Sequence, residues 1–326
     1  MNKEFLFLFF IFLFCFTGCG QSAKEKRDSA ILSARISLTQ GNCQQAIDTL
    51  ESAGRDQFSA DYLTTLSSAY SCRAGFSQVA FFGTDVSKID GANIEGSFST
   101  FSTSPLTSGY TPDTDTKFKD LQTAIDVLLY AGNLSTPSHA GRSTYFSSRE
   151  LGNISTQALY LLVAQLGKFG KYYGNSNSSG LKGLGTGTNS CYFQYTDIQA
   201  LAAITWLNTN TTNDTCNSGS LLGHPDLDTG IQTTADVFKR MCRGVILFNN
   251  FADVFIGTTL STGSQFDAIR NIQDDIQSYI VSCNVTGSST PLGALCNVRS
   301  QTECETVATD SSLQIYYAAI FEALHL

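Results

Sequence analysis

The sequence predicts an all-α protein, built as a helical-hairpin array or as an irregular α-α superhelix with long loops rich in Ser, Thr and Gly. Apolar residues recur at intervals of three and four along much of the chain, which is the spacing of one face of a helix. All 5 prolines fall between these apolar runs, as expected because proline interrupts a helix. Several residues between positions 28 and 90 recur 34 positions later, and a repeat of that length is typical of stacked helical hairpins.

The chain opens with the pattern of an export signal. Met1-Asn2-Lys3-Glu4 precedes an unbroken run of 12 apolar residues from Phe5 to Phe16. A membrane-spanning helix needs roughly 18 apolar residues or more, so we interpret residues 1–18 as a signal peptide that is removed. A permanent transmembrane anchor is the alternative.

Phe16-Thr17-Gly18-Cys19 follows this run directly and resembles the lipobox of bacterial lipoproteins, most of which carry Leu where this chain has Phe16. The resemblance implies cleavage before Cys19, acylation of that cysteine and attachment to the lipid bilayer. Several acyl chains hold a protein stably, because each buried methylene contributes about 0.8 kcal/mol. Gly20 in place of Asp implies sorting to the outer membrane, facing the periplasm.

The residues that follow the lipidated cysteine are polar and show no apolar period. We therefore predict that residues 19–28 form a tether between the membrane and the folded part. Lys24, Lys26 and Arg27 could contact anionic headgroups, and a solvated linker is the alternative.

The composition describes a folded chain with a weakly charged surface. Hydrophobic residues make up 42% and charged residues 15%, and the formal net charge is −8. That balance permits a sizeable core. No basic run occurs outside the tether, so nucleic acid is not expected as a partner.

The cysteine count predicts disulfide bonds. Of 10 cysteines, Cys15 lies in the signal peptide and Cys19 takes the lipid, which leaves an even set. In an exported chain such a set indicates disulfides. A zinc site is the competing interpretation, but no Cys-x-x-Cys pair occurs and no histidine has ligand spacing, so neither a metal nor a cofactor is predicted. The remaining cysteines are Cys43, Cys72, Cys191, Cys216, Cys242, Cys283, Cys296 and Cys304.

Residues 29–90 resemble tetratricopeptide units. In the first unit, Gly41, Ala46, Leu50 and Ala53 stand at the spacing of the turn glycine and the second-helix packing positions of that repeat. The spacing from Leu32 to Gly41 is nine residues, where the consensus has eight, and Phe58 stands at the position of the closing proline. Two hairpins of a general helical bundle are the alternative. The residues that recur 34 positions apart are Leu32, Ser33, Gly41 and Ala46, matched by Leu66, Ser67, Gly75 and Ala80.

The repeat geometry implies one disulfide. The second helix of the first unit should run antiparallel to the first helix of the next unit, across a turn near Gln57, so that Cys43 and Cys72 lie opposite each other. Antiparallel helices pack about 8 to 10 Å apart, and inward-facing cysteines can then reach the Cα separation of roughly 4.4 to 6.8 Å that a disulfide requires. The pairing of the other six cysteines stays open.

The rest of the chain divides into a loop and further helices. Residues 91–116 are rich in Ser and Thr and contain Pro105 and Pro112, which predicts a loop. We expect its Phe98, Phe101 and Tyr110 to dock on the folded part, and lining a site is the alternative. Residues 117–326 form the helical remainder of the same domain. Its expected helices cover residues 118–129, 158–173, 196–208, 237–255, 265–282 and 313–324.

No motif in the sequence predicts a catalytic site. The glycines of residues 180–187 lack the spacing of a phosphate-binding loop, and the Asp pairs at 113/115 and 226/228 do not complete a calcium loop. His139 and His224 lie in expected turns, His325 is next to the last residue, and Trp206 is expected in the core.

The predicted function is a non-enzymatic binding or scaffold lipoprotein of the cell envelope. Stacked helical hairpins offer a surface for a protein, peptide or small-molecule partner. The combination of lipid anchor and helical repeats resembles the lipoprotein T component associated with TRAP transporters, and more distantly the helical lipoprotein of the β-barrel assembly machinery. These resemblances imply help with solute capture or with outer-membrane assembly. A surface-exposed structural or adhesive lipoprotein is the alternative, and an enzyme with an unrecognised site is a further one.

Overall fold

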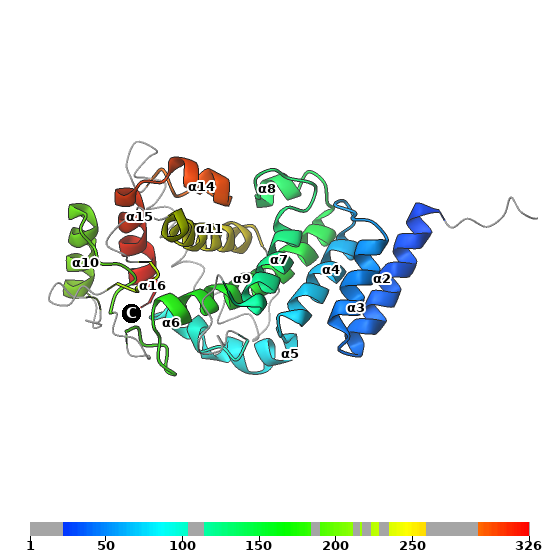
Figure 1. Ribbon diagram of the computed structural model, residues 1–326, viewed down its shortest axis with the longest axis horizontal. Coiled ribbons are helices and arrows are strands. Elements are labelled where there is room, and N and C mark those ends of the chain that lie inside the picture. Colours follow the sequence, from blue (N-terminus) through cyan, green and yellow to red (C-terminus); the bar gives the residue numbers. More distant parts are fainter. Residues whose placement is uncertain are drawn as a thin grey trace, which may run out of the picture.

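The computed structural model describes residues 22–103, 114–183, 190–210, 216, 223–227, 235–258 and 293–325. Every regular element in these ranges is a helix (Figure 1), which confirms the all-α prediction. None of the described helices is both long enough and apolar enough to cross a bilayer. The predicted signal peptide, Cys19, Tyr110 and the helix expected at 265–282 lie outside the described residues.

The first three helices of the described chain pack against one another. Helices α2 (Ala23–Thr39), α3 (Cys43–Ser52) and α4 (Ala60–Arg73) lie side by side at one end of the molecule (Figure 1). Gly41 and Gly75 follow α2 and α4, and their φ angles of 75° and 82° lie in the left-handed region that favours glycine. Each glycine therefore stands just after the end of a helix, where its left-handed conformation lets the chain turn.

Helix α2 begins inside the segment that we expected to be a tether. Ser22 accepts a hydrogen bond from the backbone N–H of Glu25, and the Glu25 carboxylate accepts one from the backbone N–H of Ser22. This capping box satisfies two backbone donors at the helix start, and Lys24 pairs with Asp28 one turn later. The prediction that all of residues 19–28 form a tether is therefore wrong for residues 23–28.

The segment predicted as a second repeat unit differs from the first after Gly75. Helix α5 (Gln78–Ala80) continues into a π turn, η1 (Phe81–Asp85), and a 3-10 turn, η2 (Val86–Lys88), instead of a regular second helix. Phe81 is buried against Phe101 and Tyr160. The wider π winding thus accompanies the packing of a large aromatic side chain.

The segment predicted as a loop contains a buried helix. Helix α6 (Ile94–Ser99) starts at Asn93, whose side chain accepts a hydrogen bond from the backbone N–H of Gly96. The hydroxyls of Ser97 and Ser99 donate to carbonyls of the preceding turn, so polar side chains are tolerated there. The loop prediction for residues 91–116 is wrong for this helix, although Phe98 and Phe101 are buried as expected.

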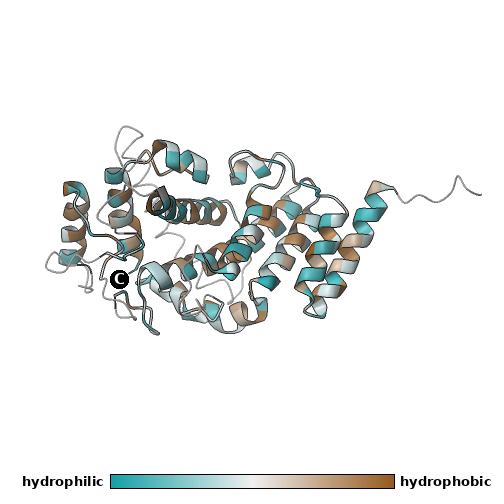
Figure 2. Cartoon of the chain, viewed as in Figure 1, coloured by the Kyte–Doolittle hydropathy of each residue, from teal (hydrophilic) through white to brown (hydrophobic). Residues whose placement is uncertain are grey.

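Helix α9 (Ser148–Tyr173) is the central helix of the fold. Its start carries a second capping box, between Ser147 and Glu150. Helices α4, α6, α7 (Thr116–Leu129) and α11 (Ala235–Gly257) all pack on α9. Figure 2 shows hydrophobic and hydrophilic residues alternating around these helices, as expected of elements that each cover part of one core.

The C-terminal helices close the other end of the molecule. They are α10 (Ile198–Asn210), α14 (Gln301–Val307), α15 (Asp310–Tyr316), the π turn η3 (Tyr317–Phe321) and α16 (Glu322–Leu324). Helix α10 packs on α15 and η3 and buries Ala200, Ile204 and Leu207. Trp206 lies on the opposite face and is 62% exposed, so its expected place in the core is wrong.

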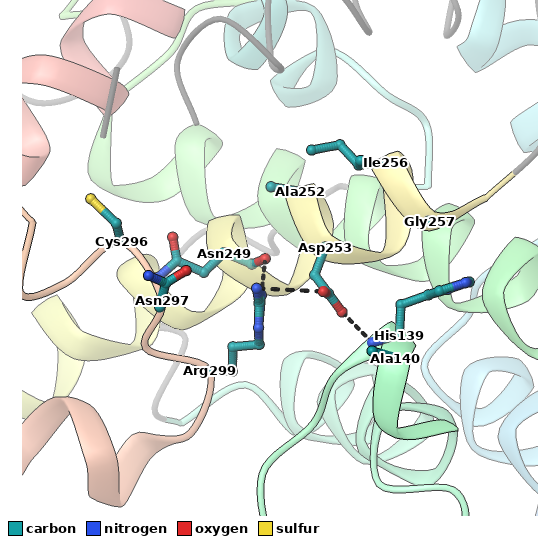
Figure 3. Close-up of a pocket in the computed structure, with 10 residues that line it drawn as sticks. All are labelled: His139, Ala140, Asn249, Ala252, Asp253, Ile256, Gly257, Cys296, Asn297 and Arg299. Carbon is teal, nitrogen blue, oxygen red and sulfur yellow. Dashed lines mark hydrogen bonds and ion pairs between the residues drawn. The ribbon is translucent and has the colours of Figure 1, made fainter. Parts of the chain in front are cut away.

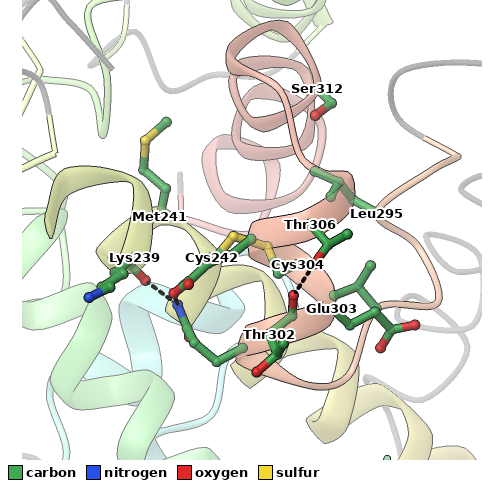
Figure 4. The surroundings of a disulfide bond; sticks show 12 residues. Lys239, Met241, Cys242, Leu295, Thr302, Glu303, Cys304, Thr306 and Ser312 are labelled. Atoms are coloured by element: carbon green, nitrogen blue, oxygen red, sulfur yellow. Dashed lines mark hydrogen bonds between the residues drawn. A yellow bond between two sulfur atoms is a disulfide. The ribbon is translucent and has the colours of Figure 1, made fainter. Parts of the chain in front are cut away.

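Three disulfides join described residues. Cys43 and Cys72 link α3 to α4 with a Cα–Cα distance of 5.6 Å, which is the pair implied by the repeat geometry. Cys191 is joined to Cys216, and Cys242 to Cys304 between α11 and α14 (Figure 4). Cys296 is disulfide-bonded as well.

Candidate ligand-binding site

A cavity of about 380 Å³ lies between the short helix α8 (His139–Arg142), the C-terminal half of α11 and the segment before α14 (Figure 3). Its volume falls within the range of small-molecule sites, roughly 300 to 1,000 Å³. The lining residues are His139, Ala140, Asn249, Ala252, Asp253, Ile256, Gly257, Cys296, Asn297 and Arg299.

Asp253 is the electrostatic centre of this cavity. Its Oδ2 atom accepts a hydrogen bond of 2.7 Å from the backbone N–H of His139. The Arg299 guanidinium lies 3.4 Å from Oδ1, and the Arg142 guanidinium lies 3.7 Å from Oδ2. Among the described residues, one carboxylate therefore faces two cations, so this group of side chains carries a net positive charge.

Arg142 is fully buried and pairs with Asp253, which lines the cavity. Its Nη1 atom donates to the carbonyl of Leu129 at 3.0 Å, while Nε and Nη2 have no hydrogen-bond partner among the described residues. Burial lowers the pKa of Arg142 to about 10, against the opposing effect of Asp253. The side chain stays protonated at neutral pH, so its positive charge acts on the site without full compensation.

His139 contributes its backbone N–H to Asp253 and turns its ring elsewhere. Figure 3 shows the imidazole directed away from the Asp253 carboxylate, and Nδ1 lies 3.4 Å from the Ser155 hydroxyl. Burial and the Arg142 cation lower the pKa of His139, while Asp253 raises it. A Cβ added at Gly257 would lie 2.3 Å from Cγ of the ring, so glycine is required for the ring to occupy this place.

Asn249 fixes the opposite wall. Its side-chain amide donates to the carbonyls of Leu295 and Val298, both at 2.7 Å, and its oxygen accepts from the hydroxyl of Tyr316 at 2.6 Å. Arg299 donates to the Asn249 carbonyl at 3.3 Å. The wall is therefore held in place before any ligand arrives, which reduces the entropic cost of binding.

This arrangement is suited to binding an anion. Arg299 reaches the cavity with a guanidinium that is engaged by only one carboxylate and one carbonyl in the described structure, and guanidinium groups bind carboxylates and phosphates well. Asp253 is held by three positively polarised groups, the backbone N–H of His139 and the guanidinium groups of Arg142 and Arg299.

The sequence pointed to few of these residues. Cys43 and Cys72 form their disulfide in the N-terminal hairpins, away from the cavity, and Cys19 lies outside the described residues. His139 was expected in a turn, but it begins α8 and lines the site. Arg142, Asp253 and Arg299 are far apart in the chain and share no motif, so only the packing of α8, α11 and the segment before α14 brings them together.

Three buried residues have the spacing of a metal site, but two of them form a disulfide. The ligand atoms of Cys191, Cys216 and Glu322 lie within 4.8 Å of one another. The two cysteines are joined in one disulfide, so they cannot supply the thiolates that bind zinc.

Comparison of the whole chain with protein-family models, curated proteins and solved structures finds no match in any of the three.

Proposed function

We propose that this protein is a lipid-anchored, non-enzymatic binding protein of the cell envelope, on the outer membrane and facing the periplasm, and that its cavity binds a small anionic ligand. The observation that carries the ligand class is the single carboxylate of Asp253 between two guanidinium groups. The lipobox resemblance at Cys19 supports the anchor. The disulfides are in keeping with an oxidising compartment.

The helical hairpins support a second candidate function, the recruitment of a protein or peptide partner. Leu32 and Ile36 lie one turn apart on α2 and are exposed, although apolar side chains are usually buried in a packed helical array. A tetratricopeptide-like surface on α2 to α4 would serve a transporter or an envelope-assembly complex. A structural or adhesive lipoprotein on the cell surface is the alternative.

Titration calorimetry tests the anion site. We expect small carboxylates or phosphate to bind the purified protein, while neutral analogues of the same shape do not. Arg299→Gln should weaken binding about tenfold or more, because a charge-assisted hydrogen bond to a ligand is worth roughly 1.5 to 3 kcal/mol.

Two further variants make this experiment decisive. Asp253→Asn removes the competing carboxylate and should strengthen anion binding, while Arg149→Gln, an exposed arginine on α9, should leave it unchanged. Absence of binding by the whole anion panel, or equal binding by the wild type and both cavity variants, would contradict the proposal.

A further inference from the structure

A second group of charged side chains lies in the interior and takes no part in the cavity. We call Glu95, Lys182, Tyr192, Glu322 and His325 the buried cluster. Each of them is almost completely buried, with Lys182 2% and Glu322 1% exposed. They come from α6, the segment after α9, the segment before α10, and α16 and the residue that follows it.

Glu322 is held by three donors with different roles. Its Oε1 atom accepts hydrogen bonds of 2.8 Å from the backbone N–H of Tyr192 and from the hydroxyl of Tyr195. Its Oε2 atom faces the ammonium of Lys182 in a direct ion pair. One oxygen is thus polarised by two neutral donors, while the other is next to an amine.

Lys182 is confined to this position. Its ammonium nitrogen lies 6.0 Å from the centre of the Tyr192 ring. The preceding backbone is held by Asn93 of the residues before α6, whose side-chain amide donates to the carbonyl of Gly180 at 3.3 Å. The Lys182 amine and the Glu322 carboxyl group therefore stay in contact in a site from which bulk water is excluded.

Glu95 supplies a second carboxyl beside the pair. Its Oε1 atom has no hydrogen-bond partner among the described residues, and its carboxyl is hydrogen-bonded to the Tyr192 hydroxyl, which also lies 2.7 Å from Nδ1 of His325. Burial raises the pKa of Glu95 well above its usual range, and the nearby Lys182 opposes this only in part. Glu95 is thus poised to carry a proton.

We propose that Lys182 and Glu322 are joined by an isopeptide bond that forms spontaneously once the chain has folded. The geometry brings together the three requirements of this reaction: an amine against a carboxyl group, two donors on the oxygen that gains negative charge, and a neighbouring carboxyl that can carry a proton.

The reaction balances without any other reagent. The Lys182 ammonium passes one proton to Oε2 of Glu322, and the neutral amine attacks the carboxyl carbon to form the C–N bond. Negative charge develops on Oε1, where Tyr192 and Tyr195 donate. The nitrogen then loses a second proton, which Glu95 relays to the Oε2 hydroxyl; the C–O bond breaks and one water molecule leaves. No atom is oxidised or reduced.

The mass of the intact protein tests this bond. After complete reduction and denaturation, the chain should be lighter by one water than the mass calculated for its sequence and lipid. Proteolysis should release a branched peptide that contains both Lys182 and Glu322. The full calculated mass, with the two residues in separate peptides, would show an ordinary ion pair and overturn the proposal.

Variants locate the chemistry. Lys182→Met and Glu322→Ala should both have the full calculated mass. Lys171→Arg is the matched control, because Lys171 donates to the backbone carbonyls of Ser176 and Asn177 and is not a member of the buried cluster; this variant should still be lighter by one water. Loss of water in Lys182→Met would place the linkage elsewhere and refute it here.

The role of Glu95 has its own measurement. Chain isolated unfolded from inclusion bodies is refolded, and the loss of water is followed by mass spectrometry. Glu95→Gln should form the bond about a hundredfold more slowly or worse, as expected when proton transfer is removed, with an unchanged far-ultraviolet spectrum. Glu95→Asp should recover part of the rate. Bond formation by Glu95→Gln at the wild-type rate would exclude Glu95 from the reaction.

Discussion

His325 shows how burial changes the properties of a single side chain. Its ring nitrogens contact the hydroxyls of Tyr192 and Ser176 and the carbonyl of Gly180. Burial lowers the pKa of His325 to about 3. Between about pH 3 and pH 6.5 the His325 imidazole is therefore neutral in the folded protein but protonated in the unfolded chain.

This shift predicts a loss of stability in acid. The unfolded pKa is near 6.5, so the contribution of His325 is constant above that pH and declines as the pH falls toward 3, because the unfolded state then binds the extra proton. At pH 5 the loss is about 2 kcal/mol, from roughly 1.5 pKa units at 1.36 kcal/mol each. Urea denaturation at pH 7 and pH 5 measures it.

A variant isolates this contribution from that of other groups. His325→Gln should lower the stability at pH 7 but should show a decline between pH 7 and pH 5 that is smaller by about the same 2 kcal/mol. His224, whose pKa burial lowers to about 4, remains in both proteins and acts in the same direction. Identical declines in the two proteins would contradict the assignment.

The sequence predicts few of the individual residues that form the cavity or the buried cluster. Glu95, Lys182 and Glu322 look like surface residues when read in their local context, since charged side chains are rarely buried without a partner. Their partners lie more than eighty residues away in the chain. Only tertiary packing shows that they meet, and the same holds for Arg142, Asp253 and Arg299.

Individual helices are where the sequence is most informative. The period of apolar residues locates α7, α10, α11 and the C-terminal part of α9. Ser-x-x-Glu at Ser22 and Ser147 stands at the starts of α2 and α9, although neither start was predicted. Helix α6 escapes because its six residues are too few for a period and are rich in Ser. The π turns escape because they depend on how Phe81 and Tyr317 pack.

The disulfide between α3 and α4 makes a prediction at the scale of helices. The bond spans 29 residues, and closing a loop of that length should stabilise the folded state by about 3 to 4 kcal/mol through the unfolded chain. Replacing Cys43 by Ser together with Cys72 by Ser should therefore lower the melting temperature by roughly 10 °C, as measured by calorimetry.

Non-reducing peptide mapping provides the accompanying control. Wild-type protein purified without reductant should release a Cys43–Cys72 linked peptide, and reductant should lower its melting temperature further than it lowers that of the double variant. Free thiols at both positions in the wild type, or an unchanged melting temperature in the variant, would count against the pairing.

For the whole molecule, the fold class follows from the sequence and the arrangement does not. The all-α prediction rests on local periodicity, which the described structure confirms. That α9 becomes the central helix between the N-terminal hairpins and the C-terminal helices depends on contacts between distant segments, and nothing in a local window of residues carries that information.

The proposed anchor is tested on the whole protein. Cells grown with labelled palmitate should label the chain, and it should sediment with membranes, because Cys19 carries the acyl groups. Cys19→Ala should abolish the label and release the protein from the membrane fraction. A wild-type chain without label would refute the anchor. Protease treatment of intact cells separates a periplasm-facing protein, which is protected, from one on the cell surface.

The position of Glu322 in the chain has a consequence for the order in which the molecule matures. A ribosome makes Glu95 first, then Lys182, and Glu322 only 140 residues after Lys182. Until α16 has been synthesised and packed, two charged groups wait in an interior that is still open to water. The chain cannot complete this region until its last residues are in place, so the open region stays accessible to chaperones and proteases until folding is nearly finished. The buried cluster is thus complete only at a late stage of folding, when α16 has packed.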